Sequence, residues 1–308
     1  MVRCLKTLFW LKKCRALSVV MIDTGQITED SEYHESLDMD YRKFISRIGC
    51  FREEIPENIR PTWLKLTTIT MVSSHLRDQG VELDHDKLKK VFKNMQYLTI
   101  VKKGASGGTF NWQIFYGKTE FYNQVTIGYQ DSLSTKKVKI FPNGSLQVAG
   151  CVDISDCHRF IDQLQVILMA IYGVHLPRST FRIVMINSNF SLNYSINLMN
   201  VITAFEKENF SIVFDPDRYS AVKIKFKPVE DGKQITTSIF ASGSIIITGA
   251  ENLNEVSEAY VKIVSVLNSC RGVYVEASPS IKDFDYFGGY MYSNLFSKIM
   301  SDTTKNVL

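Results

Sequence analysis

Phe240-Ala241-Ser242-Gly243-Ser244-Ile245-Ile246-Ile247-Thr248-Gly249-Ala250 reads as a strand end, a tight Ser-Gly turn and a second strand that closes on glycine. A run with helical character, residues 254–267, follows at once. The chain contains this layout twice, because Phe141-Pro142-Asn143-Gly144-Ser145-Leu146-Gln147-Val148-Ala149-Gly150 precedes a helical run over 153–169. Phe141, Gly144 and Gly150 lie 99 positions before Phe240, Gly243 and Gly249, respectively. A repeat of that size is a domain-sized unit, since solenoid repeats run about 20 to 50 residues.

Composition bounds the class of protein. The 308 residues are 45% hydrophobic, enough for a sizeable core in about two domains, and the net charge of +4 permits a nucleic-acid partner without requiring one. The six cysteines include no C-x-x-C pair, so we expect neither a zinc site nor a disulfide framework, and no metal or other cofactor. Lys12, Lys13 and Arg15 interrupt any signal-peptide core, and no apolar run approaches the ~20 residues of a membrane span. We therefore expect a soluble intracellular protein.

Four segments are predicted along the chain. Residues 1–60 form a leader, partly disordered, with a short helix over 41–51; residues 61–177 form the first repeat and 178–278 the second; residues 279–308 form an aromatic tail. The first repeat carries an insertion, about 97–116, which has no counterpart in the second repeat and reads as a hairpin around Gly104–Gly108.

Both repeats share one order of elements: a strand, a helix, three antiparallel strands and a long helix. In the first repeat the expected segments are 63–74, a helix through 87–92 capped by Asp84 or Asp86, 121–129, 137–141, 145–149 and 153–169. In the second they are 181–187, 196–208, 219–226, 236–240, 244–248 and 254–267. This order predicts an α+β fold in which an antiparallel sheet has helices on one face.

A period of two assigns each strand residue to one face of the sheet. Apolar side chains face the helices: Val138, Ile140, Leu146, Val148, Val222, Ile224, Phe226, Ile245 and Ile247. The other face, called here the open face, carries lysines, small polar side chains and aromatics: Lys137, Lys139, Phe141, Gln147, Ala149, Lys223, Lys225, Ile246 and Thr248.

Two interpretations of the open face compete. Exposed strand lysines are ordinary on the solvated side of a half-buried sheet and discourage edge aggregation. That interpretation accounts less well for Phe141 and Phe240, which each end a strand at equivalent places beside lysines. Lysines neutralise phosphates and apolar side chains can wedge between base steps, so the symmetric pattern favours a nucleic-acid interface.

These residues resemble the TATA-binding-protein family, whose core is two copies of a strand, helix, strands and helix unit that form a saddle over DNA. The family's Phe-x-Ser-Gly turn and its Thr-Gly-Ala ending are similar to Phe240–Gly243 and Thr248–Ala250, and its acidic stirrup is similar to 214–219. The resemblance covers roughly residues 62–276. In the first repeat it rests on Phe141, Asn143-Gly144 and Gly150, with Tyr122 as a weaker match.

The resemblance implies a transcription initiation factor, not an enzyme, that binds promoter DNA through the minor groove and bends it. Its wedges would be Tyr122 and Phe141 in the first repeat and Tyr219 and Phe240 in the second. Thr248, Ile246, Gln147 and Ala149 would line the groove, and Lys223 and Lys225 would approach phosphates. Asp215 and Asp217 would contact a TFIIB-like initiation factor and, through it, RNA polymerase. No membrane or small-molecule partner is implied.

Several positions depart from the family pattern. The family's central asparagines correspond to Val72 and Met185, so that Asn187 is the nearest substitute on the same face. Groove-lining leucines become Lys139 and Ser238, and a groove threonine becomes Ala149. The helix after the first repeat carries Asp153, Asp156 and Asp162, which argues against a TFIIA-like contact. Such drift resembles the TATA-binding-like factors of large nucleocytoplasmic DNA viruses, which implies the nucleus or, for a viral protein, a cytoplasmic viral factory or the virion.

Two other function classes stay open. A saddle that has lost DNA bending would act as a protein-interaction scaffold in a transcription complex, and the departures at Val72, Met185 and Tyr122 favour it. An enzyme or small-ligand protein is the third class. It lacks support, because the five histidines show no metal spacing, 104–108 lacks the Gly-Lys-Ser/Thr of a phosphate loop, and Cys151 and Cys157 read as buried small hydrophobes.

Overall fold

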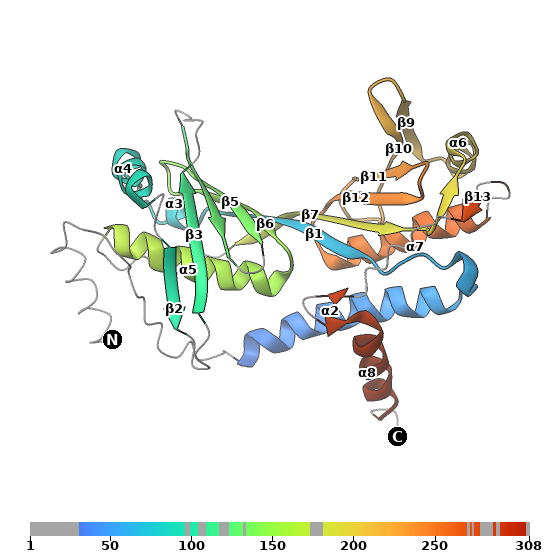
Figure 1. Cartoon of the computed structure of the whole chain (residues 1–308), viewed down its shortest axis with the longest axis horizontal. Coiled ribbons are helices and arrows are strands. Elements are labelled where there is room, and N and C mark those ends of the chain that lie inside the picture. The colour runs from blue at the N-terminus through green and yellow to red at the C-terminus, as the bar shows by residue number, and fades with distance from the viewer. Residues whose placement is uncertain are drawn as a thin grey trace. The chain divides into compact units, whose positions relative to one another are not determined.

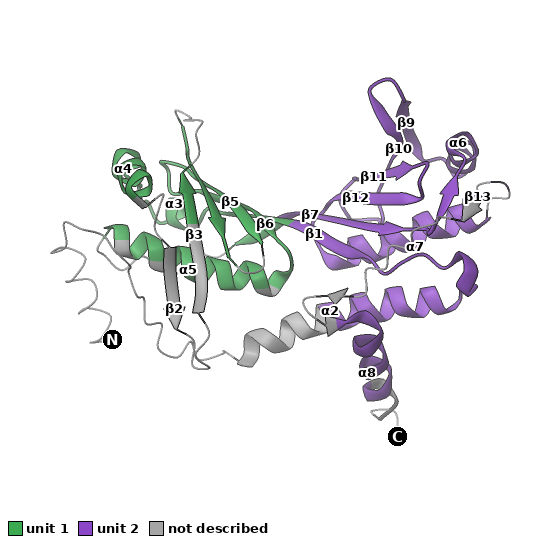
Figure 2. Cartoon of the chain, viewed as in Figure 1, with its two compact units in different colours: residues 1–29, 69–183 green, residues 30–68, 184–308 purple. Residues whose placement is uncertain are grey.

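The computed structural model describes residues 31–95, 99–103, 109–116, 123–131, 134–172, 181–269, 272, 274–277, 286–287 and 290–305. The described chain divides into two compact units (Figure 2): unit 1 lies within residues 69–183 and unit 2 within 30–68 and 184–308. The boundaries between the units fall inside two strands, β1 (Lys65–Ser73) and β7 (Arg182–Ser191).

Unit 1 is an antiparallel sheet backed by helices (Figure 1), with the strand order β2-β3-β4-β5-β6-β1. α4 packs against β3 and β4, and α5 packs against β6. The elements are α3 (His75–Asp78), α4 (His85–Met95), β2 (Thr99–Lys103), β3 (Thr109–Tyr116), β4 (Val125–Gln130), β5 (Thr135–Ile140), β6 (Leu146–Cys151) and α5 (Ile154–Tyr172).

Unit 2 repeats this plan with the strand order β7-β12-β11-β10-β9, and a two-stranded sheet pairs β8 with β13. α6 packs against β9 and β10, and α7 packs against β12. The elements are α2 (Ser31–Glu53), a 3₁₀ turn (Glu57–Ile59), β8 (Tyr194–Ile196), α6 (Leu198–Lys207), β9 (Ser211–Asp215), β10 (Tyr219–Phe226), β11 (Ile235–Phe240), β12 (Ser244–Ala250), α7 (Leu253–Ser269), β13 (Tyr274–Ala277), β14 (Tyr286–Phe287), β15 (Tyr290–Met291) and α8 (Tyr292–Lys305).

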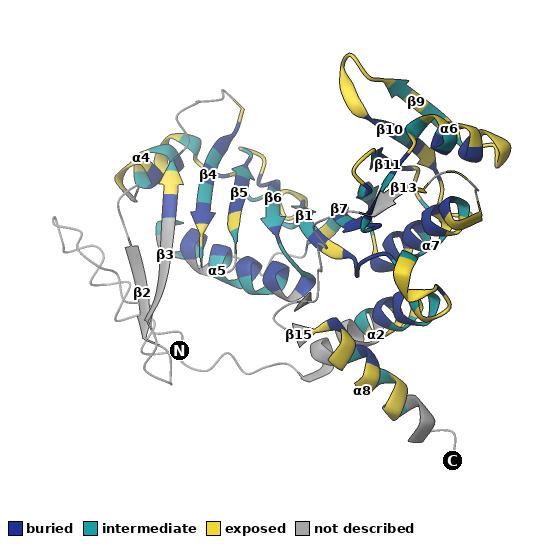
Figure 3. Ribbon diagram, turned by 45° about the vertical axis from the view of Figure 1, so that its right-hand side comes forward, coloured by how far each residue is buried: buried dark blue, intermediate teal, exposed yellow. Residues whose placement is uncertain are grey.

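The predicted α+β class and the antiparallel sheet are confirmed. Alternation along the strands is confirmed as well (Figure 3): Val138 and Val148 are fully buried, whereas Lys137 is exposed. Cys151 and Cys157 are buried, as expected of small apolar side chains. Asp84 caps α4 by accepting a hydrogen bond from the Lys87 N–H at 3.0 Å.

The predicted number of strands is wrong. Four strands, not three, follow the helix in unit 2, because β9 precedes the Asp215–Asp217 turn and pairs with β10. In unit 1, β3 occupies the equivalent place, since it pairs with β4 in the same antiparallel way. The stretch 109–116 therefore has a counterpart after all, and only β2 adds a strand to unit 1.

Both ends of the described chain contribute to the core of unit 2. α2 is longer than the predicted 41–51 helix and buries Phe44, Ile45 and Ile48. α8, which the sequence did not suggest, packs on α2, and its Tyr292 ring stacks on Trp63 with centroids 4.7 Å apart. Tyr292 also donates a hydrogen bond to the Leu64 carbonyl. The aromatic tail thus helps to stabilise unit 2.

Equivalent turns and helix starts are built alike in the two units. Gly144 and Gly243 have φ of +79° and +80°, a conformation that glycine adopts without strain. A Cβ on Gly243 would stand 2.0 Å from the Tyr194 carbonyl oxygen, so the turn also has no room for a side chain at this position. Asp153 accepts a hydrogen bond from the Asp156 N–H at the start of α5, and Asn252 accepts one from the Glu255 N–H at 2.8 Å at the start of α7.

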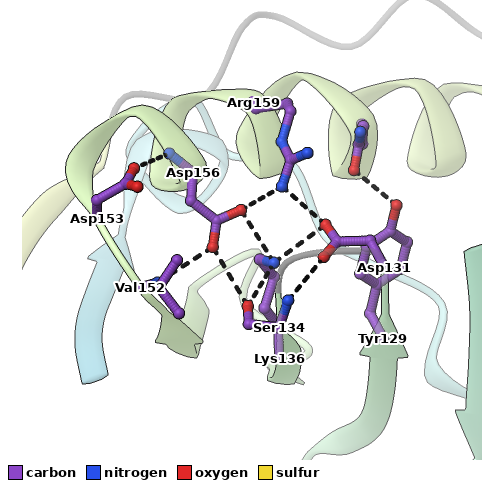
Figure 4. Close-up of polar contacts among 9 residues, drawn as sticks. Tyr129, Asp131, Ser134, Lys136, Val152, Asp153, Asp156 and Arg159 are labelled. Carbon is purple, nitrogen blue, oxygen red and sulfur yellow. Dashed lines mark hydrogen bonds and ion pairs between the residues drawn. The ribbon is translucent and has the colours of Figure 1, made fainter. Parts of the chain in front are cut away.

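A buried ionic network closes one end of unit 1 (Figure 4). Lys136, 0% exposed, lies 3.1 Å from Asp131 and 3.0 Å from Asp156, and its ammonium donates a hydrogen bond to Ser134. Arg159 pairs with both carboxylates. Beside the network, the Tyr129 hydroxyl donates to Gln163 at 2.6 Å, and burial raises the pKa of that hydroxyl. The buried charges of Lys136, Asp131 and Asp156 are stabilised by this pairing, because an unpaired charge away from solvent is costly.

Removal of Lys136 tests the network. Lys136→Met leaves two buried carboxylates with Arg159 alone, and we expect the free energy of unfolding to fall by about 3–5 kcal/mol. Lys137→Met is the matched control, because Lys137 is exposed on the adjacent position and its loss should change stability by less than about 0.5 kcal/mol. Urea denaturation followed by circular dichroism compares the two, and equal stabilities would contradict the account.

Asp153 gives a pH-dependent prediction. Burial is the largest cause that raises its pKa above the ordinary value. Such a carboxyl holds more protons folded than unfolded, so its contribution to stability falls as pH rises from the unfolded-state pKa, about 3.9, through the raised folded-state pKa. Asp153→Asn keeps a good N-cap and should raise stability at pH 7.

The gain from Asp153→Asn should shrink as pH falls toward 4, which urea titrations across that range would measure. Asn252→Asp, at the exposed equivalent position of α7, is the control and should have little effect. A gain that is independent of pH would count against the raised pKa as its cause.

Candidate nucleic-acid interface

The strand register arranges the open-face residues of unit 2 in two rows that run across the sheet. Asn189, Ile246, Ser238 and Lys223 are successive Cα partners in the first row. Thr248, Thr236 and Lys225 are successive partners in the second. The predicted residues Ile246, Thr248, Lys223 and Lys225 therefore share one surface. The Thr248 hydroxyl donates to the Thr236 carbonyl at 3.1 Å, which fixes its orientation.

An aromatic pair ends this face. Tyr219 begins β10 and Phe240 ends β11, and their rings meet edge to face with centroids 5.6 Å apart. The Lys223 ammonium lies 4.4 Å from the centre of the Tyr219 ring, so a cation accompanies the pair. Tyr219 is 38% exposed. The two predicted wedges of unit 2 are thus brought together, at a strand end and beside a lysine.

The open face of unit 1 follows the same two rows. Val72, Gln147, Lys139 and Thr126 are successive partners in the first. The second runs through Thr70, Ala149, Lys137, Gly128 and Phe115. Gln147, Ala149 and Lys139 share this face as predicted.

The wedge position of unit 1 is described in part. Phe141 is half-buried, with its N–H bonded to the Ser145 carbonyl at 2.9 Å, and Tyr122 lies outside the described residues. A cavity of about 570 Å³ adjoins Phe141, with Val72 and Gln147 of the open face in its lining together with Arg77 and Arg182. Phe141 therefore borders a hollow lined by two arginines and by Asp78, which pairs with Arg77 at 3.0 Å.

The register identifies functional candidates that the sequence interpretation missed. Asn189, not Asn187, is the partner of Ile246, although both asparagines lie on the open face of β7. Neither side-chain Oδ1 has a hydrogen-bond partner among the described residues, and both are buried. Burial of Ile186, Ser188 and Phe190 fixes this parity, and the same alternation in the sequence could have indicated Asn189.

Phe115 is the second missed candidate. It is 37% exposed on the open face of unit 1. It packs beside Gly128, where an added Cβ would stand 3.5 Å from the Phe115 Cβ. The sequence analysis assigned 97–116 to an insertion and so gave Phe115 no place in the sheet.

The acidic stirrup is an exposed turn between β9 and β10. Asp215, Asp217 and Arg218 are exposed, and the Arg218 N–H donates to the Asp215 carbonyl at 3.1 Å. The Arg218 Nε lies 3.6 Å from the Asp215 carboxylate, a solvent-exposed pair that offsets little of the negative charge.

Other kinds of site find no support within the described ranges. No group of three or more histidine, cysteine and acidic side chains is placed to hold a metal ion there. Among the same residues, no helix is long and apolar enough to cross a membrane.

The chain is similar to known proteins in sequence and in structure. Residues 180–270 match the family model described as transcription factor TFIID (or TATA-binding protein, TBP). A protein of Acanthamoeba polyphaga mimivirus described as TATA-box-binding protein-like is 29% identical over 251 residues. That match covers 67% of this chain and 65% of the relative, so the chain spans less than two thirds of the relative's length. The solved structure titled Methanococcus jannaschii TBP has a TM-score of 0.47 and 14% identity, and the match covers 67% of this chain and 98% of that chain.

The matched range contains the open-face residues of β7, β10, β11 and β12, the aromatic pair and the acidic stirrup. The family model therefore matches the part of the chain from which the interface of unit 2 was built. Over residues 180–270 the chain is thus similar to the TATA-binding-protein family, and over 251 aligned residues it is similar to a viral TATA-box-binding protein-like relative.

Proposed function

We propose that the chain is a transcription initiation factor that binds duplex DNA through its open faces, from the minor groove, and bends it. Members of the TATA-binding-protein family, to which the chain is similar, are transcription-related DNA-binding factors without enzymatic activity. The observation that carries the proposal is the pairing of Tyr219 with Phe240 under the Lys223 ammonium. Two rings at a strand end, beside a cation, suit a wedge that enters a base step next to a phosphate.

The side chains on the two open faces support the same proposal. Ile246, Thr248 and Ala149 are short or apolar side chains that let a groove approach the strands closely. Lys225 is exposed at the outer side of β10, where it would neutralise a phosphate. Phe141 and Tyr122 would form the wedge pair of the first repeat. The segments 1–60, 61–177, 178–278 and 279–308 remain our proposed division of the chain.

The acidic stirrup is proposed to recruit a protein. Asp215 and Asp217 project negative charge from a turn, and a TFIIB-like factor with a basic surface would bind there and bring RNA polymerase. Such a role implies a nuclear protein or, for a viral one, a cytoplasmic viral factory or the virion.

A protein-interaction scaffold is the second candidate. Unit 2 exposes Met199 (62%) on α6 and Tyr274 (51%) and Val275 (58%) on β13. β13 pairs with β8, the strand that precedes α6. Neighbouring exposed apolar side chains such as Tyr274 and Val275 favour a protein partner, with or without DNA.

The wedge role is tested with Phe240→Ala. An aromatic contact with a base contributes about 1–3 kcal/mol, so affinity for a short A·T-rich duplex should fall about 5- to 150-fold. Fluorescence anisotropy at two salt concentrations measures the change. Tyr274→Ala is the control, because it removes an exposed aromatic away from the open face and should leave affinity unchanged. Unaltered binding by Phe240→Ala would rule out the wedge.

The stirrup role is tested with the double variant Asp215→Asn, Asp217→Asn. It should bind DNA as the parent chain does, yet fail to form the slower-migrating complex that a TFIIB-like factor produces in a gel-shift assay. Glu230→Gln with Asp231→Asn removes two equally exposed charges from another hairpin of unit 2 and should have no effect. Loss of the complex in both double variants would point to general charge rather than to the stirrup.

A further inference from the structure

The two open faces are unlike at the strands that correspond to each other. In unit 1, Lys139 of β5 and Gln147 of β6 are direct cross-strand partners. The equivalent partners in unit 2 are Ser238 of β11 and Ile246 of β12. One face therefore presents a cation and an amide at the position where the other presents a small hydroxyl and an alkyl group.

The polar pair of unit 1 is placed to act together. Direct cross-strand partners have Cβ atoms about 4.5–5.5 Å apart, so the long side chains of Lys139 and Gln147 reach the same point above the sheet. Both are half-buried on the open face, and Gln147 also lines the hollow beside Phe141. Lysines of unit 2 lie one strand further out, since Lys223 and Lys225 belong to β10, the counterpart of β4. Lys139 on β5 is two strands from β1, whereas Lys223 on β10 is three strands from β7, so the lysine of unit 1 stands about 4.8 Å nearer the first strand of its repeat.

The chemistry of the minor groove gives this difference a meaning. All base pairs offer acceptors on the groove floor, and G·C pairs add one donor, the guanine amino group. The glutamine carbonyl accepts a hydrogen bond from such a donor, and the lysine ammonium donates to the neighbouring acceptors. The Lys139–Gln147 pair can therefore satisfy a G·C pair.

The corresponding positions of unit 2 cannot do the same. Ile246 has no acceptor, and Ser238 is only 7% exposed. A guanine amino group against Ile246 would be buried without a partner, which is costly. Asn189 offers an amide on the neighbouring strand β7, so the comparison concerns only the base pairs that face β11 and β12.

We propose that unit 1 takes a half-site that contains G·C, recognised by Gln147 with Lys139, whereas unit 2 requires an A·T half-site. This inference rests on the proposed function, because it assumes that the open faces bind the minor groove. It predicts an asymmetric DNA site, read in one direction.

The test uses three duplexes of equal length: A·T in both half-sites, one G·C pair in one half-site, and one G·C pair in each. The full chain should bind the first two within about threefold of each other and the third about tenfold more weakly or worse. The double variant Lys139→Ser, Gln147→Ile gives unit 1 the side chains of unit 2. It should bind the duplex with one G·C pair about tenfold more weakly than the all-A·T duplex.

Two further variants complete the design. Ile246→Gln gives unit 2 an amide and should bring the third duplex to within about threefold of the first. Lys225→Thr removes one exposed lysine and should weaken binding to all three duplexes by the same factor. Circular dichroism melting verifies that each variant folds. If the double variant does not fold, the duplex ratios measured for Ile246→Gln test the inference instead.

The outcomes separate the inference from the proposed function. If the full chain binds none of the duplexes at 50 mM salt, the proposed function fails and the inference with it. If it binds them but the ratios between duplexes are the same in the parent chain, the double variant and Ile246→Gln, the inference fails and DNA binding stands. Ratios that change as described support both.

Discussion

A buried carboxylate in the first turn of each long helix holds the strands of its unit in place. In unit 1, Asp156 accepts hydrogen bonds from the Val152 N–H at 3.1 Å and the Ser134 hydroxyl at 3.2 Å. In unit 2, Glu255 accepts from the Glu251 N–H at 2.7 Å and the Lys233 N–H at 3.0 Å. Each carboxylate thus joins the end of one strand, the start of the helix and the turn before another strand, in the manner of a capping box. The open face depends on this joint, because the joint fixes the strands from which the face is built.

The buried carboxylate has different partners in the two units, and the open faces of the two units also differ in their side chains. Unit 1 adds Lys136 and Arg159 and becomes an ionic network, whereas unit 2 uses backbone donors and an asparagine cap. On the other side of the sheet, unit 1 carries lysines on β5 and unit 2 carries them on β10. Two units that share a plan can therefore present different side chains to a duplex. The sugar-phosphate backbone of the duplex is the same in both half-sites. Sequence preference would then come from side chains at a few cross-strand positions, with the lysines and the aromatic pair supplying affinity.

Much of the fold could be predicted because period-two alternation and glycine turns are local signals. They located the strands from Tyr219 to Ala250 almost to the residue. β9 was missed because it is short and half-exposed, with only Ile212 and Phe214 half-buried and Val213 exposed. Lys136 shows a deeper limit: it looks like Lys137 and Lys139 in the sequence, and only Asp131 and Asp156, brought from a turn and a helix, make its burial possible. α8 was missed for a similar reason, since the stacking of Tyr292 on Trp63 joins residues far apart in the chain. Asn189, by contrast, could have been found from the local alternation in β7.

The central claim is that the open faces hold and bend duplex DNA, and end-to-end energy transfer on a short duplex labelled at both ends tests it most directly. Titration with the full chain, at low and at higher salt, reports binding and bending together. The account predicts that the two ends approach each other on a duplex with an A·T-rich half-site, and that the effect weakens as salt rises. Binding with no change in the distance between the ends, or no binding at low salt, would contradict it and leave the protein-interaction scaffold as the function to pursue.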